Sequence, residues 1–464
     1  MRRTSRWRMG LAVLGCLSAC DSSPRDASLS EEEPASIPLP PEPPPAPVES
    51  PPEPSAARLC GPARRPCTVQ LQEPVANLPG AGSWVTPTLV LDAQRRPHVF
   101  GAGAFEPSRG GVLAMRSSSG DWSVQQLPAD WTGAAFGLST GGAPLVTRAQ
   151  DTGPDAPSEL WEWTEEGWHS KARLGTRLLP WLGVSALRTD GTGALHALLR
   201  TDEAFPRPVY VSESNGWTPR LLGSGGRISL LPGFALAPGG GAHAAYWEYV
   251  KDRWLLSWQS LSSPPERVLS LPDPGWPADA ISGSRIRVAV TTPGSPRGPE
   301  TAHLFFIRPQ DALRGYSEVA YATRTGEGAW TTHTLVRDQL LTPRCVDTPP
   351  TEQRRTCEEE SIVHWPGPLV ATPGEVRLFI PWVRTRVQLG ARCAHGTCQW
   401  QSEDWTHTYG LDLSWVEEGT VQTVPLSQGV ERLRLWDAQA DLEGRIHLLG
   451  QDESSWRYLI LGAP

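Results

Sequence analysis

The stretch from residue 183 to residue 223 constrains the fold most, because it contains four short runs of alternating apolar and polar residues. These runs span residues 184–188, 194–199, 209–212 and 217–222, and the turns between them include Asp190-Gly191 and Asn215-Gly216. Period-two runs bounded by glycine, asparagine, aspartate and proline are typical of short antiparallel strands. The stretch therefore predicts one four-stranded antiparallel unit.

The same pattern recurs along most of the chain, at intervals of roughly 40 to 60 residues, which is typical of repeat architectures. The 47 prolines and 45 glycines fit a chain rich in turns, and long amphipathic helical patterns are hard to find. We therefore predict an all-β fold, a β-propeller of about seven four-stranded blades. The last unit, from residue 431, ends one strand short.

A propeller has to close its ring, because otherwise its first and last blades expose sheet edges. Residues 67–71 (CTVQL), which precede the first unit, resemble residues 420–424 (TVQTV) of the sixth unit. We predict that a strand from near residues 67–73 completes the seventh blade.

The N-terminus has the features of a secretory signal. Basic residues are followed by an apolar stretch at 9–17 and by two small residues before Cys20. Residues 17–20 (LSAC) resemble the lipobox of bacterial lipoproteins, in which the cysteine is lipidated and becomes the new N-terminus. The resemblance implies a signal peptide at 1–19, a membrane anchor on Cys20, and a place in the cell envelope, in the outer rather than the inner membrane. Ordinary signal cleavage beside an incidental cysteine is the alternative.

Residues 20–57 read as a lipidated cysteine followed by a disordered spacer. Residues 21–57 contain 12 prolines and no aromatic side chain, so they lack the apolar surface that folding requires. The remaining residues, 58–464, are assigned to the propeller. The net charge of −8 argues against nucleic acid as the main partner.

A histidine occupies the same place in five units, after a turn and at the start of the second strand: His98, His196, His243, His303 and His447. A ring of imidazoles could bind a metal or an anion. Alternatively, each imidazole holds its own turn by a hydrogen bond. We favour the second interpretation, because Leu145 and Arg377 take the equivalent positions in units two and six. No metal or other cofactor is predicted.

Six cysteines lie beyond the signal region, in an exported chain where disulfides are expected. The simplest pairing is local, between neighbours in the sequence: Cys60–Cys67, Cys345–Cys357 and Cys393–Cys398. A zinc site formed by Cys393, His395, Cys398 and His407 is the alternative, although the spacing is not a standard one.

Glycine followed by tryptophan marks several hairpins between third and fourth strands, at Trp122, Trp168, Trp217 and Trp330. We expect these tryptophans to pack between blades. Their placement resembles the Asp-box of sialidase-like and BNR-repeat propellers, although most copies lack the internal aspartate. The resemblance covers about residues 67–464 and implies the architecture. The catalytic residues of sialidases have no counterparts here, so no catalytic residue is assigned.

Long connections gather on one side of the predicted propeller, at 101–110, 149–158, 200–208, 308–317, 338–361 and 385–407. Function often lies on loops held by a rigid scaffold. The sixth unit is richest in aromatic and cationic residues, and its candidate ligand-binding residues are Trp382, Arg384, Arg386, Trp400 and Trp405. Alternatively, these tryptophans cover disulfide-linked loops as a small local core.

These observations predict a membrane-anchored lipoprotein whose propeller is a non-catalytic binding module for a protein or polysaccharide partner. The alternative is a carbohydrate-active enzyme, a sialidase-like hydrolase or a polysaccharide lyase, with its site on the same face. An architectural envelope protein without a concave site is a third possibility. Two carboxylates at glycosidase separation would favour the enzyme, whereas tryptophan and arginine alone would count against it.

Overall fold

The chain divides into two units, Met1–Glu53 and Pro54–Pro464, and every described residue belongs to the second. The computed structural model describes residues 68–75, 87–101, 111–128, 135–149, 157–176, 178–180, 187–201, 203, 206–228, 232–272, 286–292, 299–311, 316–342, 345, 356–372, 375–394, 397–417, 420–426, 433–441, 443–452 and 455–462. The predicted signal peptide, Cys20, the spacer and the Cys60–Cys67 pair lie outside them.

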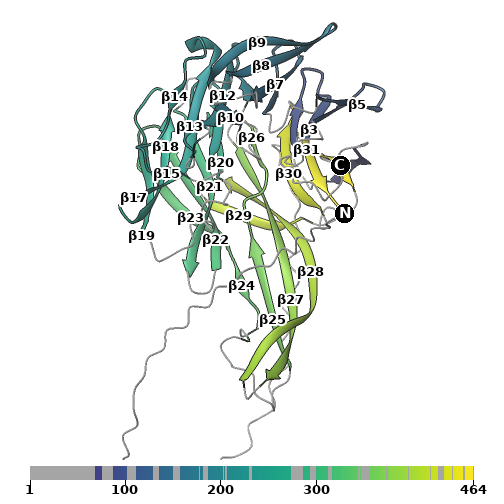
Figure 1. Cartoon of the computed structure of the whole chain (residues 1–464), viewed down its shortest axis with the longest axis vertical. Coiled ribbons are helices and arrows are strands. Elements are labelled where there is room, and N and C mark those ends of the chain that lie inside the picture. The colour runs from purple at the N-terminus through teal and green to yellow at the C-terminus, as the bar shows by residue number, and fades with distance from the viewer. Residues whose placement is uncertain are drawn as a thin grey trace, which may run out of the picture. The chain divides into compact units, whose positions relative to one another are not determined.

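The strands of the described residues form seven antiparallel sheets (Figure 1). The first three sheets contain β2 (Thr88–Leu91), β3 (Pro97–Gly101), β4 (Val112–Arg116) and β5 (Trp122–Gln126); β6 (Phe136–Leu138), β7 (Pro144–Ala149), β8 (Pro157–Thr164) and β9 (Gly167–Thr176); and β10 (Leu178–Pro180), β11 (Leu187–Thr189), β12 (Leu195–Thr201), β13 (Pro208–Ser212) and β14 (Arg220–Leu221). The next two contain β15 (Arg227–Ile228), β16 (Gly233–Leu236), β17 (Ala242–Val250), β18 (Arg253–Ser260) and β19 (Glu266–Pro272); and β20 (Arg287–Thr291), β21 (Thr301–Asp311), β22 (Tyr316–Thr325) and β23 (Thr331–Arg337). The last two contain β24 (Gln339–Leu340), β25 (Thr356–His364), β26 (Leu369–Thr372), β27 (Glu375–Ala394), β28 (Thr397–Glu417) and β29 (Thr420–Pro425); and β30 (Arg434–Ala440), β31 (Ile446–Gln451), β32 (Trp456–Gly462) and β1 (Thr68–Pro74).

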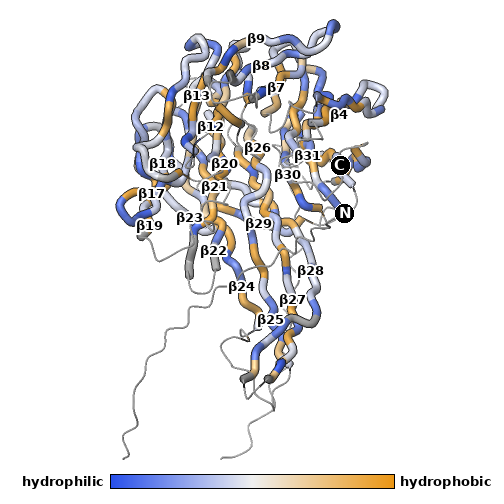
Figure 2. The backbone as a smooth tube through the Cα atoms, viewed as in Figure 1, coloured by the Kyte–Doolittle hydropathy of each residue, from blue (hydrophilic) through white to orange (hydrophobic). Residues whose placement is uncertain are grey.

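The sheets follow one another around a ring, because each shares a hydrophobic core with the next. Six clusters of buried side chains join blades one and two, two to four, four and five, five and six, six and seven, and seven and one. Apolar residues are concentrated in strands inside the ring, whereas outer strands such as β9 are largely polar (Figure 2). The all-β, propeller-like fold is therefore confirmed. Six of the seven sheets are compact blades, whereas the sheet of the sixth unit is extended, so the blade count differs slightly from the predicted seven, and two of the compact sheets have five strands instead of four. No helix in the described part of the chain is long and apolar enough to cross a membrane.

The ring closes as predicted. Strand β1 pairs antiparallel with β32, from Thr68 opposite Gly462 to Pro74 opposite Arg457. The Glu73 carboxylate accepts hydrogen bonds from Arg116 Nε at 2.6 Å and from Trp122 Nε1 at 2.7 Å. Both donors belong to blade one, so the closing strand also joins the last blade to the first.

The third blade departs from the predicted boundaries at its outer edge. Only Arg220–Leu221 pairs there, because a short 3₁₀ turn (Glu213–Asn215) and left-handed backbone at Gly216 (φ 65°) and Trp217 (φ 63°) occupy the preceding residues. Two of the predicted inter-blade tryptophans are confirmed. Trp122 contacts Tyr458 of blade seven, and Trp330 contacts Trp258 of blade four, with ring centroids 5.6 and 5.7 Å apart.

Blade six corrects the prediction of long loops at 338–361 and 385–407. Within those ranges β27 and β28 continue as one hairpin beyond the other strands (Figure 1), and β25 pairs with its edge. The sequence from Val383 to Val387 alternates apolar or β-branched residues with arginine, which is a strand pattern. Two disulfides, Cys345–Cys357 and Cys393–Cys398, join its parts as predicted. Because both cysteines of the second pair are oxidised, the zinc alternative is wrong.

Candidate functional site

A central channel of about 480 Å³ runs between the innermost strands of the seven blades. Its walls come from β2, β6, β11, β16, β20, β26 and β30. Most lining residues are apolar or small. The charged residues among them are Arg188 on β11, Arg287 on β20, Asp437 on β30, and Asp92 just after β2.

Three of these charges interact across the channel. Asp437 accepts hydrogen bonds from the backbone N–H groups of Leu89 and Ala438, both at 2.9 Å. Burial raises the pKa of Asp437, and the two arginines oppose that rise. Burial lowers the pKa of Arg188 and of Arg287, and the Asp437 carboxylate opposes the effect in both cases. The charges therefore share a poorly hydrated space.

A second cavity, also about 480 Å³, lies between blades five, six and seven. Its aromatic residues are Trp365, Trp382, Tyr409 and Trp436, and its cations are Arg287 and Arg434. Arg287 and Trp436 line both cavities, so the second cavity lies at one mouth of the channel. We call it the mouth pocket. Among the described residues that line it there is no aspartate or glutamate.

Trp382 is held in place by a glycine on the neighbouring strand. It pairs with Gly410 on β28, where an added Cβ would lie only 1.9 Å from Trp382 Cζ2. The missing side chain at residue 410 lets the indole lie flat across the strand. The indole Nε1 donates to Asp412 Oδ1 at 3.3 Å. Burial raises the pKa of Asp412, and the interaction with His364 and this hydrogen bond oppose the rise.

Blade seven supplies the opposite wall of the mouth pocket. The Arg434 guanidinium lies over the Trp436 ring, 4.4 Å from its centroid, which is a cation–π contact. Tyr409 of blade six lines the pocket together with Arg434. Trp436 also contacts Trp456, with ring centroids 5.8 Å apart, which supports its position. The mouth pocket thus combines flat apolar surfaces with two positive charges.

The predicted site residues Arg384 and Arg386 lie farther along β27 and form ion pairs with β25. Arg384 Nε is 2.6 Å from Glu360 Oε1, and Arg386 Nε is 2.6 Å from Glu358 Oε1. These hydrogen bonds raise the pKa of each arginine, and Arg384 lowers that of Glu360. Both guanidinium groups are exposed and already have acidic partners.

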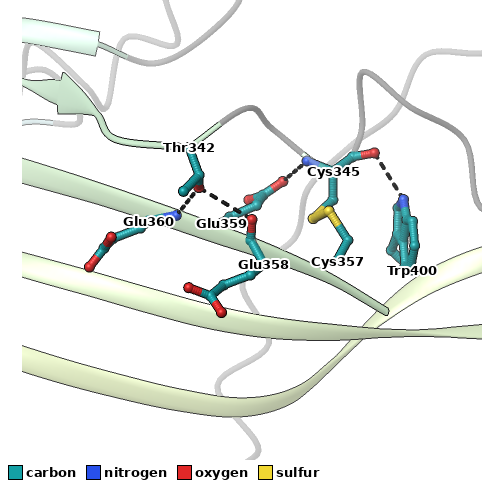
Figure 3. The surroundings of a disulfide bond; sticks show 7 residues. All are labelled: Thr342, Cys345, Cys357, Glu358, Glu359, Glu360 and Trp400. Carbon is teal, nitrogen blue, oxygen red and sulfur yellow. Dashed lines mark hydrogen bonds between the residues drawn. A yellow bond between two sulfur atoms is a disulfide. The ribbon is translucent and has the colours of Figure 1, made fainter. Parts of the chain in front are cut away.

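Trp400 and Trp405 have different surroundings. Trp400 Nε1 donates to the Cys345 carbonyl at 2.9 Å, so this indole lies beside the Cys345–Cys357 disulfide, as the local-core alternative predicted (Figure 3). Trp405 is 55% exposed and begins a row of rings on β28 that continues with His407 and Tyr409. Of the five predicted residues, Trp382 alone is among those that line the mouth pocket.

Three of the five repeated histidines, His98, His196 and His447, contact the aspartate of their own turn. His303 instead lies 2.9 Å from Thr291 Oγ1, and neither ring nitrogen of His243 has a hydrogen-bond partner among the described residues. His196 Nε2 lies 3.0 Å from Asp190 Oδ2 in its turn, and its Nδ1 lies 2.7 Å from the Tyr210 hydroxyl on the next strand. Asp190 Oδ1 in turn accepts from the N–H groups of Thr192 and Ala194. The same aspartate–histidine contact recurs at His98 and His447. No group of three or more potential metal ligands occurs in the part of the chain that the structure describes.

Sequence reasoning missed most of the mouth pocket: Arg287, Trp365, Tyr409, Arg434 and Trp436. One signal was present, since Arg188 and Arg287 are charged residues within runs that form first strands, as in RIRVAV at 285–290. A charge on the innermost strand of a propeller faces the channel or a neighbouring blade. The pocket itself combines residues from three blades, which the order of the chain does not reveal.

No protein-family model matches the chain, and no curated protein matches it. Solved structures do. The polysaccharide lyase Uly1 aligns at a TM-score of 0.43 and 10% identity, over 81% of this chain and 89% of that one. A PL25 ulvan lyase aligns at 0.39 and 8%, over 83% and 96%. The Aleuria aurantia lectin, in complex with α-methyl-L-fucoside, aligns at 0.34 and 10%, over 70% and 95%. One fold hosts many activities, and these likenesses indicate no activity for this chain.

Proposed function

We propose that the propeller is a non-catalytic module that binds a polysaccharide at the mouth pocket. The observation that carries the proposal is the pocket's lining: three tryptophans and a tyrosine around about 480 Å³. Ligand pockets usually have such a size and combine apolar walls with a few polar groups. Aromatic faces stack on the C–H faces of sugar rings, and the arginines can donate hydrogen bonds to hydroxyl or acidic groups.

The alternative, a carbohydrate-active enzyme at the same pocket, lacks the support that a pair of carboxylates would give. Glycosidases of the common type place two carboxyl groups roughly 5 to 10 Å apart across the scissile bond. The described lining has arginine and tryptophan instead. Asp412 accepts a hydrogen bond from the Trp382 indole N–H and is not among the described lining residues, so its role is to position the indole. We therefore favour binding over hydrolysis.

The binding test uses the full-length protein, purified in detergent and screened on a glycan array, with Trp382→Ala and Trp382→Phe alongside. Trp382→Phe keeps one aromatic ring but loses the pyrrole ring with its N–H, so it should retain more binding than Trp382→Ala. Trp382→Ala should reduce affinity by about 5- to 150-fold, since an aromatic anchor is worth about 1–3 kcal/mol.

The matched control is Trp163→Ala, because Trp163 is a half-buried tryptophan of blade two that contacts Trp168 and does not line the pocket. If the protein captures an envelope protein and binds no glycan, its partner is a protein and not a polysaccharide. If the wild type cleaves any polysaccharide of a test panel, the protein is an enzyme and the proposal of a non-catalytic module is refuted.

We also propose that the protein is a lipoprotein of the bacterial cell envelope, anchored in the outer membrane through Cys20. The support is the LSAC sequence at 17–20 and the proline-rich spacer after it. Several acyl chains hold a protein firmly on a membrane, whereas one chain is marginal. Mass spectrometry of the N-terminal peptide should find acyl chains on Cys20, and Cys20→Ser should abolish them. An unmodified Cys20 in membrane-bound protein would refute the anchor.

A further inference from the structure

Two buried arginines line the channel, and one of them also lines the mouth pocket. Arg287 lines both cavities, and Arg188 lines the channel and interacts electrostatically with Arg287. The Nε atoms of both arginines are buried, and neither has a hydrogen-bond acceptor among the described residues. A buried donor without an acceptor is costly, so an acceptor atom of a ligand beside these arginines would be stabilised.

The charges around these arginines do not cancel. Asp437 is the acidic group that interacts with both of them, and its carboxylate already accepts two backbone hydrogen bonds. The other acid of the lining, Asp92, is bound by Arg96 Nε at 2.7 Å and lies 3.3 Å from His98 Nε2. The described lining holds two arginines and two aspartates, but Asp92 is paired with Arg96 outside the lining, so Asp437 is the one acid left opposite both Arg188 and Arg287.

We propose that Arg287, supported by Arg188, binds an oxyanion group of the polysaccharide, so that the ligand is an acidic glycan. The inference rests on the proposed function and deepens it. A sugar ring stacks on the aromatic wall of the mouth pocket while its carboxylate or sulfate reaches the channel entrance. Guanidinium groups suit both anions, because their planar fork donates two parallel hydrogen bonds to neighbouring oxygens.

The test compares three tetrasaccharides by calorimetry on the full-length protein: tetragalacturonate, its carboxyl-reduced neutral counterpart, and a sulfated form of that neutral compound. Binding of an acidic form at least about tenfold tighter than the neutral one is expected, because hydrogen bonds to charged groups are the strong ones. A preference for the uronate or for the sulfate identifies the source of the oxyanion. Higher salt should reduce the preference.

Variants assign the preference to the arginine. Arg287→Gln keeps most of the side-chain length and removes the charge, so it should lose the preference for acid and keep neutral binding. Arg287→Lys keeps the charge and should restore part of the preference. Arg384→Gln is the matched control, because Arg384 is an arginine of the same protein paired with Glu360 outside the pocket. Thermal melts verify that each variant is folded.

The outcomes separate the two proposals. If the wild type binds the acidic and neutral tetrasaccharides equally, the oxyanion inference is overturned and polysaccharide binding stands. This comparison needs no variant, so it holds even if Arg287→Gln does not fold. If a preference exists and persists in folded Arg287→Gln, the inference is also overturned. If the wild type binds no glycan on the array or in solution, the proposed function fails and the inference fails with it.

Discussion

Replacing His303 with glutamine should make the protein markedly less sensitive to acid. His303 is 7% exposed, its Nε2 lies 2.9 Å from Thr291 Oγ1, and its Nδ1 lies 2.8 Å from the Tyr321 hydroxyl. Burial lowers the pKa of His303 from 6.5 to about 4. A neutral imidazole with two hydroxyl partners is therefore the form that the folded protein holds.

The sign and size of the effect follow from that pKa. Above pH 6.5 the imidazole is neutral in both the folded and the unfolded chain, and it adds no pH dependence. Between pH 6.5 and about 4 the unfolded chain binds a proton that the folded chain does not, so stability falls as the pH falls. A pKa difference of about 2.5 corresponds to about 3 kcal/mol of unfolding free energy lost by pH 4.

The assay is urea unfolding of the wild type and His303→Gln at pH 7.5 and pH 4. The difference in unfolding free energy between the two proteins should shift by about 3 kcal/mol in favour of the variant as the pH falls. His169→Gln is the control, because His169 is exposed on β9. If the unfolding free energies of wild type and His303→Gln fall by the same amount between pH 7.5 and pH 4, burial of a neutral imidazole is refuted.

Two further predictions test the closure of the ring and the mouth pocket. In a urea titration, Glu73→Gln should lower the unfolding free energy by about 1–3 kcal/mol, because it removes the charge that accepts hydrogen bonds from Arg116 and Trp122. The control is Glu443→Gln, which alters an exposed ion pair between the same two blades. It should lower the unfolding free energy by less than about 1 kcal/mol. Gly410→Ala should displace the Trp382 indole, and should therefore reduce glycan affinity as much as Trp382→Ala does while lowering stability by about 1–3 kcal/mol. Unchanged glycan affinity in Gly410→Ala would show that the position of Trp382 is unimportant.

The ring and its closure were predictable from the sequence because they depend on local patterns and one edge argument. Period-two runs fix strands, and turn residues separate them. A last unit without its outer strand leaves an edge that only a strand from elsewhere can cover, and β1 was the candidate with a matching pattern. The turn contacts of His98, His196 and His447 also followed from position alone, because a residue repeated at one turn can stabilise that turn.

The length of the sixth blade was harder to predict, because an insertion between two strands reads equally as a loop or as longer strands. Here Val383, Thr385 and Val387 alternate with arginines whose acidic partners lie on β25, far along the sequence. The pairing of this segment with β28 closes a local hairpin, whereas its pairing with β25 is non-local and is not displayed by the sequence. The mouth pocket was missed for the same reason, since Arg287, Trp382 and Trp436 belong to three blades.

The extended hairpin and the mouth pocket have one structural origin. Strand β26 pairs with the start of β27, and β25 pairs with its far half. The segment between β25 and β26 runs along the same edge of β27 at the rim of the ring. There the backbone N–H of Trp365 donates to the Pro381 carbonyl at 3.2 Å, and the backbone N–H of Gly367 donates to the Phe379 carbonyl at 2.9 Å. This path brings Trp365 beside Trp382, and both line the pocket. An insertion in the sixth unit therefore identifies the correct blade. The residues that form the pocket lie at the base of that insertion, where the hairpin leaves the ring.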